Sequence, residues 1–312
     1  MFLLHENLYH YTRAETLIKK ILPSMEIQFG SYQNLNDPRE AKTWPFVFYT
    51  SNVDTNGKFK SSIFEEVSSY ITQKTLILCC TQDDPTVTDN DKDRDIRSGY
   101  GHPRMWSQYA DQHKGVCIVL NKKYLHKSIL SNFGSKGLYY GPVSYLKTVT
   151  GPSSNAYNIQ YLDDILKNGI SKEVEPHIDT HNKELFFTKH IDWQDEWEYR
   201  WVFRSKDNAP KLISIADSIQ AVIVGNECTE KDTSDIVSIC ATLGIPVIRL
   251  LQHGWSMSLM PIDTAEKNVI SLNGISFSTK IPCTGVFAQA RDNIGKTRPV
   301  LIKNNGEVII VE

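Results

Sequence analysis

The chain has 312 residues and a formal net charge of −2, with 40% hydrophobic and 22% charged residues. This length allows one large domain or two of ordinary size. The small net charge excludes a strong whole-protein field toward nucleic acid or an anionic membrane, and no apolar run approaches the roughly 20 residues that span a bilayer.

The first part of the chain predicts alternating strands and helices. Apolar residues indicate strands at 8–11 and 26–29, and a helical period indicates a helix at 14–21 that Pro23 ends. Residues 75–81 are continuously apolar, which is typical of a buried strand. The segment 82–102 that follows is polar and rich in aspartate, so we expect a mobile loop that could act as a lid over a site.

The rest of the chain continues this mixture and predicts an α+β fold. Expected helices lie at 104–111, 159–170, 172–189 and 231–243, and expected strands at 115–120, 138–146, 193–203, 211–215, 220–224 and 246–251. We therefore expect a domain over 1–253 built on a mixed or antiparallel sheet. Turn signals from Gly254 onward indicate a small β-rich extension over 254–312 that packs on this domain.

The segment 193–203 carries the strongest functional signal. Read as a strand, it places Glu196, Glu198 and Arg200 on one face and a row of aromatic residues on the other. Carboxylates at i and i+2 lie about 7 Å apart, and a neighbour such as Arg200 could separate their pKa values. The alternative interpretation is a solvated edge strand with an ordinary Arg–Glu pair.

Two other segments contain candidate ligand contacts. On the first strand, Tyr9 and Tyr11 share one face, and His10 lies on the other, where its imidazole could hold a ribose or phosphate. A half-buried histidine bonded to a nearby carbonyl explains His10 equally well. After the second strand, Ser31 and Tyr32 are placed to touch a ligand, whereas the Asn-Asp-Pro turn at 36–38 is explained by helix capping.

The helix at 104–111 presents an apolar face that is most simply core. Met105, Trp106 and Tyr109 fall on this face, and Gly115 ends the helix before the next strand. His113 and Lys114 lie at the junction, where they are available to a phosphate or to solvent.

Four sequence blocks together resemble a widespread, mostly bacterial family of uncharacterised domains. The blocks are Tyr9–Thr12, Asn36–Glu40, Met105–Val116 and Trp193–Arg200, with a lysine at the expected position, Lys189. The resemblance covers approximately residues 8–250 and implies no activity. Residues 255–312 lie outside it.

A second resemblance is to ADP-ribosyltransferases, which share the order of a first-strand histidine, a small or aromatic residue after the next strand and a late-strand glutamate. It implies their fold with inserted helices, NAD as substrate without a metal, and ADP-ribose transfer to an unknown macromolecular acceptor in bacterial defence or toxin action. His10 would hold the ribose, Ser31 or Tyr32 would be the middle residue, and Glu198 would be catalytic with Glu196 assisting. The full set of expected NAD contacts is His10, Tyr11, Ser31, Tyr32, Tyr109, Lys189 and Arg200.

Two other functions remain open from the sequence. The first is a nucleotide- or nucleic-acid-responsive binding module without catalysis, with phosphate contacts from His10, Lys114, Lys189 and Arg200. The second is a metal-independent phosphodiesterase or nuclease that uses His10 and Glu198 as acid and base. A net charge of −2 gives no indication of a large nucleic-acid footprint.

The cysteines and the first residues bear on the cellular compartment. Six cysteines show no paired C-x-x-C spacing, so we expect reduced thiols and no metal site. The first residues, Met-Phe-Leu-Leu-His-Glu, lack the basic start and cleavage site of a signal peptide. We therefore expect a cytoplasmic protein without a membrane partner.

Overall fold

The computed structural model describes residues 2–41, 44, 46–49, 62–147, 155–159, 162–207, 209–254 and 256–262, and farther on the backbone of five strands between Val269 and Ile310. None of the helices within these residues is long and apolar enough to cross a bilayer. The cysteines in the same residues are all free thiols: Cys79, Cys80, Cys117, Cys228 and Cys240.

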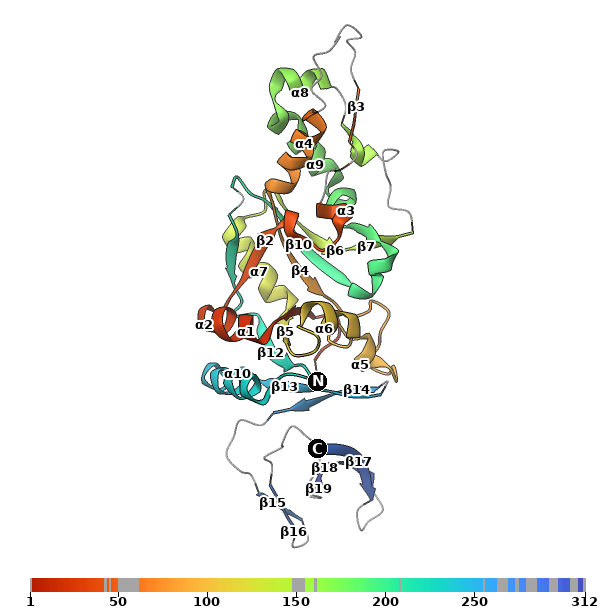
Figure 1. Ribbon diagram of the computed structural model, residues 1–312, viewed down its shortest axis with the longest axis vertical. Coiled ribbons are helices and arrows are strands. Elements are labelled where there is room, and N and C mark those ends of the chain that lie inside the picture. The colour runs from red at the N-terminus through yellow and green to blue at the C-terminus, as the bar shows by residue number, and fades with distance from the viewer. Residues whose placement is uncertain are drawn as a thin grey trace.

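The centre of the molecule is a ten-stranded sheet (Figure 1). Its strands run in the order β11-β2-β4-β1-β5-β12-β13-β14, and β10 pairs with β4 and β6 off this path. Their bounds are β1 Asn7–Thr12, β2 Glu26–Ser31, β4 Thr75–Thr81, β5 Val116–Asn121, β6 Leu138–Pro142, β10 Glu198–Arg204, β11 Lys211–Ser214, β12 Ile219–Val224, β13 Val247–His253 and β14 Ser256–Pro261. Among the described pairings of this sheet only that of β12 with β13 is parallel, and the crossover helix α10 (Glu230–Leu243) joins these two strands. The expected α+β class with a mixed, mostly antiparallel sheet is confirmed.

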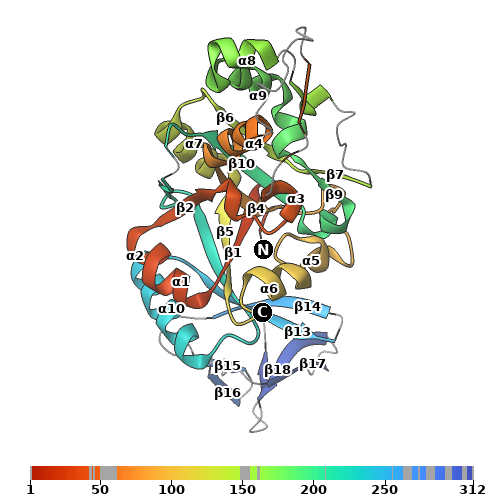
Figure 2. The ribbon, with the colours of Figure 1, turned by 45° about the horizontal axis from the view of Figure 1, so that its top comes forward.

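Helices cover both faces of this sheet (Figures 1 and 2). The longer ones are α4 (Ser62–Gln73), α7 (Lys122–Phe133), α9 (Ile170–Phe186) and α10, and the shorter helical turns are α1 Ala14–Thr16, η1 Leu17–Ile21, α2 Leu22–Ser24, η2 Tyr32–Asn34, α3 Pro38–Ala41, α5 Arg94–Arg97, α6 Pro103–Tyr109, η3 Asn155–Tyr157, α8 Leu162–Asn168 and η4 Ile191–Glu196. Short strand pairs lie outside the sheet: β3 (Val47–Phe48) with β8 (Asn158–Ile159), and β7 (Ser144–Leu146) with β9 (Thr188–His190). The helices α4 and α7 have no counterpart among the sequence-based expectations.

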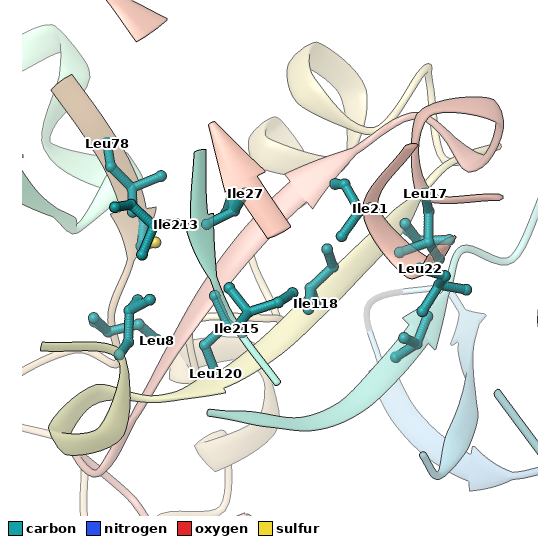
Figure 3. Packing of buried hydrophobic residues seen from close by; sticks show 14 of the residues in the cluster. Leu8, Leu17, Ile21, Leu22, Ile27, Leu78, Ile118, Leu120, Ile213 and Ile215 are labelled. Atoms are coloured by element: carbon teal, nitrogen blue, oxygen red, sulfur yellow. The ribbon is translucent and has the colours of Figure 1, made fainter. Parts of the chain in front are cut away.

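Three apolar clusters fill the space between sheet and helices. Figure 3 shows part of the largest, which contains Leu8, Ile118 and Leu120 of the sheet together with Leu17 and Ile21 of η1. A second cluster joins β4 and β10 to α4, α8 and α9. A third lies under α6, against β1, β5 and β12. Alternation along each strand divides its side chains between these clusters, since successive residues face opposite sides of the sheet.

The strand predicted at 193–203 is shorter than expected and lies inside the sheet. The strand begins at Glu198, because residues Ile191–Glu196 form the 3₁₀ turn η4 and Trp197 adopts a left-handed conformation with φ of 44°. The interpretation as an edge strand is wrong, since β10 lies between β4 and β6 and Arg200 is 0% exposed. The aromatic face is confirmed as core, with Tyr199 and Trp201 in the largest cluster.

The polar segment 82–102 consists largely of turns, with the helical turn α5 (Arg94–Arg97) near its end, and hydrogen bonds tie it to the rest of the molecule. The Asp83 carboxylate accepts hydrogen bonds from the backbone N–H groups of His5 and Gly99, each at 2.8 Å. Arg97 pairs with Asp84 at 2.7 Å and with Asp91 at 3.0 Å. Charged hydrogen bonds thus hold the segment where apolar burial is scarce.

The main sheet extends beyond the expected boundary at residue 254. Gly254, with φ of 59°, lies between β13 and β14, and β14 pairs with β13 along its whole length. Farther on, β15 (Val269–Leu272) pairs with β16 (Ile275–Ser278), and β17 (Gly285–Arg291), β18 (Thr297–Lys303) and β19 (Val308–Ile310) form a small sheet. Residues 256–261 therefore belong to the main sheet and not to the extension.

Candidate active site

A split in the central sheet creates the main cavity. Strand β4 pairs with β2 through Leu76 and Ile77, and with β1 through Thr81. Between these contacts no described strand pairs with this edge of β4, and a cavity of about 270 Å³ lies there. The five consecutive residues Ile77–Thr81 all line it. Because neighbouring residues of a strand face opposite sides, the cavity meets the edge of β4 and not one face.

His10 bridges this split. Its Nδ1 lies 3.2 Å from the carbonyl oxygen of Cys79, one of the residues without a strand partner on that edge. The side chain thus supplies a bond that a neighbouring strand would otherwise make. Burial lowers the pKa of His10, so the ring is neutral near pH 7. With the proton on Nδ1, Nε2 is left as a hydrogen-bond acceptor on a side chain that lines the cavity.

Arg200 holds two carboxylates behind the cavity wall. Its Nε and Nη2 donate to Glu198 at 2.9 and 2.8 Å. Its Nη1 and Nη2 donate to Glu40 at 2.5 and 3.0 Å, and Nη1 also reaches the carbonyl of Phe186 at 2.6 Å. Glu40 and Glu198 line the cavity, whereas Arg200 is not among the lining residues. The expectation that Arg200 contacts a ligand is wrong, because its guanidinium is fully used in orienting the two glutamates.

The two carboxylates bound to Arg200 differ in pKa. Burial would raise the pKa of Glu198, but attraction to Arg200 and Lys189 outweighs it and lowers the pKa to about 2. Burial raises the pKa of Glu40, and Arg200 opposes this only in part. We had expected Arg200 to separate the pKa values of Glu196 and Glu198. It acts instead on Glu40 and Glu198, because Glu196 lies in η4 and does not contact it.

Lys189 joins the glutamates on the cavity side. Its Nζ lies 2.7 Å from Glu196 and 3.2 Å from Glu198, and 4.6 Å from the centre of the Trp193 ring. Burial would lower the pKa of Lys189, but Glu198 and the other carboxylates raise it, so the ammonium stays charged. The second oxygen of Glu196 accepts the hydroxyl of Tyr109 at 2.9 Å.

The charged cluster has a negative balance. Glu40, Glu196 and Glu198 are only partly balanced by Lys189 and Arg200, so the cluster carries a net charge of −1 when all are ionised and is neutral when Glu40, whose pKa is raised, is protonated. Since Lys189 is the only cation among the residues described as lining the cavity, an anionic group would find little compensation there.

Two hydroxyl groups in the cavity wall lack a partner. The Oγ of Ser31 and the Oγ1 of Thr81 are buried and make no hydrogen bond within the described residues. Thr81 is only 1% exposed, and both residues line the cavity. A buried polar atom left unpaired is unfavourable, so these hydroxyls are available to a ligand that enters the cavity.

The cavity brings together most of the residues singled out in the sequence. His10 from β1 and Glu198 from β10 line it together, with the following residues from other parts of the chain: Tyr11, Ser31, Tyr109, Lys189 and Glu196. Tyr32 does not. Its ring is fully buried against Trp44 and Phe186, and its hydroxyl donates to Glu40 at 3.4 Å, so stacking on a ligand in this cavity is excluded.

Sequence reasoning missed several lining residues, among them Glu40, Cys79 and Thr81. Glu40 belongs to the Asn36–Glu40 block, but the sequence does not indicate its partner Arg200, which lies 160 residues farther along the chain. Cys79 and Thr81 were assigned only to a buried strand. They line the cavity because β1 and β2 pair with only parts of one edge of β4. A single sequence gives no indication of this pairing.

Comparison with known proteins gives one family match. Residues 105–201 match the family described as "Protein of unknown function (DUF2971)". The matched segment contains Tyr109, Lys189, Glu196, Glu198 and Arg200, and it does not reach His10. It is consistent with the resemblance to an uncharacterised domain family. No curated protein and no solved structure matches the chain.

Proposed function

We propose that the protein cleaves the N-glycosidic bond of NAD and transfers ADP-ribose to a macromolecular acceptor, in the manner of ADP-ribosyltransferases. One observation carries this proposal: the neutral imidazole of His10 and the ionised carboxylate of Glu198 line the same cavity from opposite parts of the sequence. The unpaired edge of β4 between them supplies the crevice in which the reacting half of NAD would lie.

The charge of the cavity favours the nicotinamide end of NAD. The nicotinamide ring of NAD is cationic, and cleavage moves this positive charge onto the ribose. A carboxylate fixed in its charged form stabilises such a charge where it develops, typically by about 10²–10³ in rate for one well-aimed group. Glu198 meets this condition because its pKa of about 2 keeps it ionised at neutral pH.

The size of the cavity sets how NAD would enter. Ligand pockets typically measure roughly 300–1,000 Å³, and this one measures about 270 Å³. It is therefore suited to nicotinamide and its ribose, while the diphosphate and adenosine lie outside. This orientation also avoids placing phosphates beside Glu196 and Glu198.

Each lining group then has a chemical task. The Nε2 of His10 accepts a ribose hydroxyl, and the hydroxyls of Ser31 and Thr81 bind polar groups of the ribose or the carboxamide. The bond from C1′ to the pyridine nitrogen breaks, and nicotinamide leaves as a neutral ring. The acceptor's nucleophile forms a new bond to C1′ and gives its proton to Glu196, which Tyr109 and Lys189 hold in place.

The proposal is tested by incubating the protein with NAD and measuring released nicotinamide by chromatography. We expect Glu198→Gln to lower the release about 100-fold or more. Glu175→Gln is the matched control. Glu175 pairs at 2.8 Å with Arg204, which lies on β10 as Glu198 does, but Glu175 does not line the cavity. His10→Gln, which leaves the charged cluster intact, should also reduce release. If the wild type releases no nicotinamide under any condition, or Glu198→Gln retains full release while folded, the proposal is wrong.

One observation favours a second candidate, a nucleotide-binding module without catalysis. Both oxygens of Glu198 already accept hydrogen bonds from Arg200 or Lys189, which reduces the charge they offer to a ligand. This candidate predicts that NAD binds in the cavity and is recovered intact. The phosphodiesterase is disfavoured, because a cavity with a negative balance repels a phosphodiester.

A further inference from the structure

A second and larger cavity lies on the other face of β10. It measures about 640 Å³ and is lined by residues of the N-terminus, α7, β6 and β10. Tyr199 forms part of its wall, whereas Glu198 and Arg200, one position to either side, face the first cavity and its supporting network. The two cavities are therefore separated by the sheet.

Two lysines at the start of α7 give this cavity its charge. Lys122 and Lys123 are the first two residues of the helix, and its first turn contains no acidic residue. Cations are unfavourable at a helix N-terminus, where the dipole is positive and an anion is preferred. Two lysines in this position raise the local positive potential at an end of the helix where the Asn121 side chain caps the backbone N–H groups of Lys123 and Tyr124.

Lys122 lacks a counter-ion within the described residues. It is half-buried, and burial alone accounts for the lowering of its pKa. Its Nζ lies 4.1 Å from the centre of the Tyr199 ring. Glu6 also lines the cavity but forms no ion pair with Lys122. An anion bound here would compensate a cation that the protein leaves unpaired.

His126 adds a hydrogen-bond donor of fixed position. The indole N–H of Trp201 donates to its Nδ1 at 3.2 Å. Because an indole nitrogen can only donate, Nδ1 carries no proton, and the neutral ring carries its proton on Nε2. Burial and the neighbouring Lys122 lower the pKa of His126, which keeps this tautomer at neutral pH.

Two exposed tyrosines supply aromatic surface beside these groups. Tyr140 is 52% exposed and Tyr124 is 49% exposed, and both line the cavity. The Tyr140 ring lies 4.3 Å from the ring of His126 at an angle of 56°, a tilted contact that helps to hold Tyr140 in place. An exposed aromatic ring beside lysines is the combination that binds a nucleobase together with its phosphate.

We propose that this second cavity binds a phosphorylated nucleoside, with its phosphates at Lys122, Lys123 and His126 and its base against Tyr140 or Tyr124. Its volume lies within the range of roughly 300–1,000 Å³ that is typical of ligand sites. The proposal is independent of NAD cleavage, because none of these residues lines the first cavity.

The test is binding of ADP, measured by isothermal titration calorimetry on the full chain. We expect Lys122→Gln and Tyr140→Ser each to weaken ADP binding at least tenfold. Lys127→Gln is the matched control, since Lys127 is an exposed lysine of the same helix that does not line the cavity. Thermal melting of each variant verifies that it is folded.

Three further ligands and one variant separate the alternatives. Inorganic phosphate and adenosine should each bind more weakly than ADP if both parts of the site act together. His10→Gln, altered in the first cavity only, should retain ADP binding even if it abolishes nicotinamide release. The proposal is overturned if the wild type does not bind ADP, if His10→Gln and not Lys122→Gln removes binding, or if only a single-stranded oligonucleotide binds.

Discussion

Replacement of Arg200 by methionine should strongly destabilise the protein and make it gain stability on mild acidification. The change keeps an unbranched apolar side chain like the stem of arginine but removes all five hydrogen bonds of the guanidinium. Glu40 and Glu198 then remain buried, with Lys189 as their nearest cation at 4.0 and 3.2 Å.

The size of the effect follows from the loss of one partner in a buried ion pair, which typically costs about 3–5 kcal/mol. Arg200 serves two carboxylates, so we expect the upper part of this range. The pKa of Glu198 gives a related figure. Its fall from 4.5 to about 2 corresponds to about 3 kcal/mol of stability contributed at neutral pH. A typical domain has a total stability of roughly 5–15 kcal/mol.

In the wild type the lowered pKa of Glu198 and the raised pKa of Glu40 make stability depend on pH in opposite directions, and the variant loses the first of these contributions. In the wild type, the lowered pKa of Glu198 contributes stability that is complete above about pH 4.5 and is lost as the pH falls toward about 2. In Arg200→Met the buried carboxylates lack their main counter-ion, so their pKa values rise above the unfolded values. Protonation then favours the folded state, and the variant should gain stability as the pH is lowered from 7 to 5.

Urea unfolding followed by tryptophan fluorescence measures both effects. We expect Arg200→Met to lower the free energy of unfolding by at least about 3 kcal/mol at pH 7. The double variant Glu40→Gln/Arg200→Met should recover about 1 kcal/mol or more, because one buried charge is gone. A loss below about 1 kcal/mol, or a variant that becomes less stable between pH 7 and 5, would refute this reasoning.

Other predictions concern single hydrogen bonds. Thr81→Val should change stability by less than about 1 kcal/mol, because Oγ1 has no partner in the described residues, but should weaken NAD binding about tenfold if the hydroxyl contacts the ligand. Tyr109→Phe should lower the free energy of unfolding by about 1 kcal/mol and reduce nicotinamide release, because Glu196 loses a hydrogen-bond donor. Unchanged release would show that Tyr109 has no part in the reaction. Asp83→Ala should cost about 2 kcal/mol or more and speed hydrogen exchange across 82–102. Asp93→Ala, at an exposed position of the same segment whose side chain makes no helix-capping hydrogen bond, should change neither.

Part of the fold could be predicted because local patterns reflect burial directly. The alternation at 199–203 identified an aromatic core face, and the apolar run at 75–81 identified a central strand. The split between β1 and β2 could not be predicted in this way. It depends on which residues of β4 are paired by two strands that are distant in the sequence.

The candidate site was predictable only to the extent that its residues belong to regular elements. His10 and Glu198 lie on strands, and both line the cavity. Glu196 was assigned to the wrong element but still reaches the site, since Lys189 joins it to Glu198. Tyr32 was assigned wrongly because a tyrosine after a strand end is equally suited to a ligand or to an aromatic cluster. Only tertiary packing against Trp44 and Phe186 decides between these.

A crystal structure with an uncleavable NAD analogue tests the central claim most directly. We predict nicotinamide and its ribose within the split between β1 and β2, with the ribose between His10 and Glu198 and the two phosphates outside the cavity. Analogue density with phosphates beside Glu196 and Glu198, or density only at another surface while this cavity stays empty, would contradict the account.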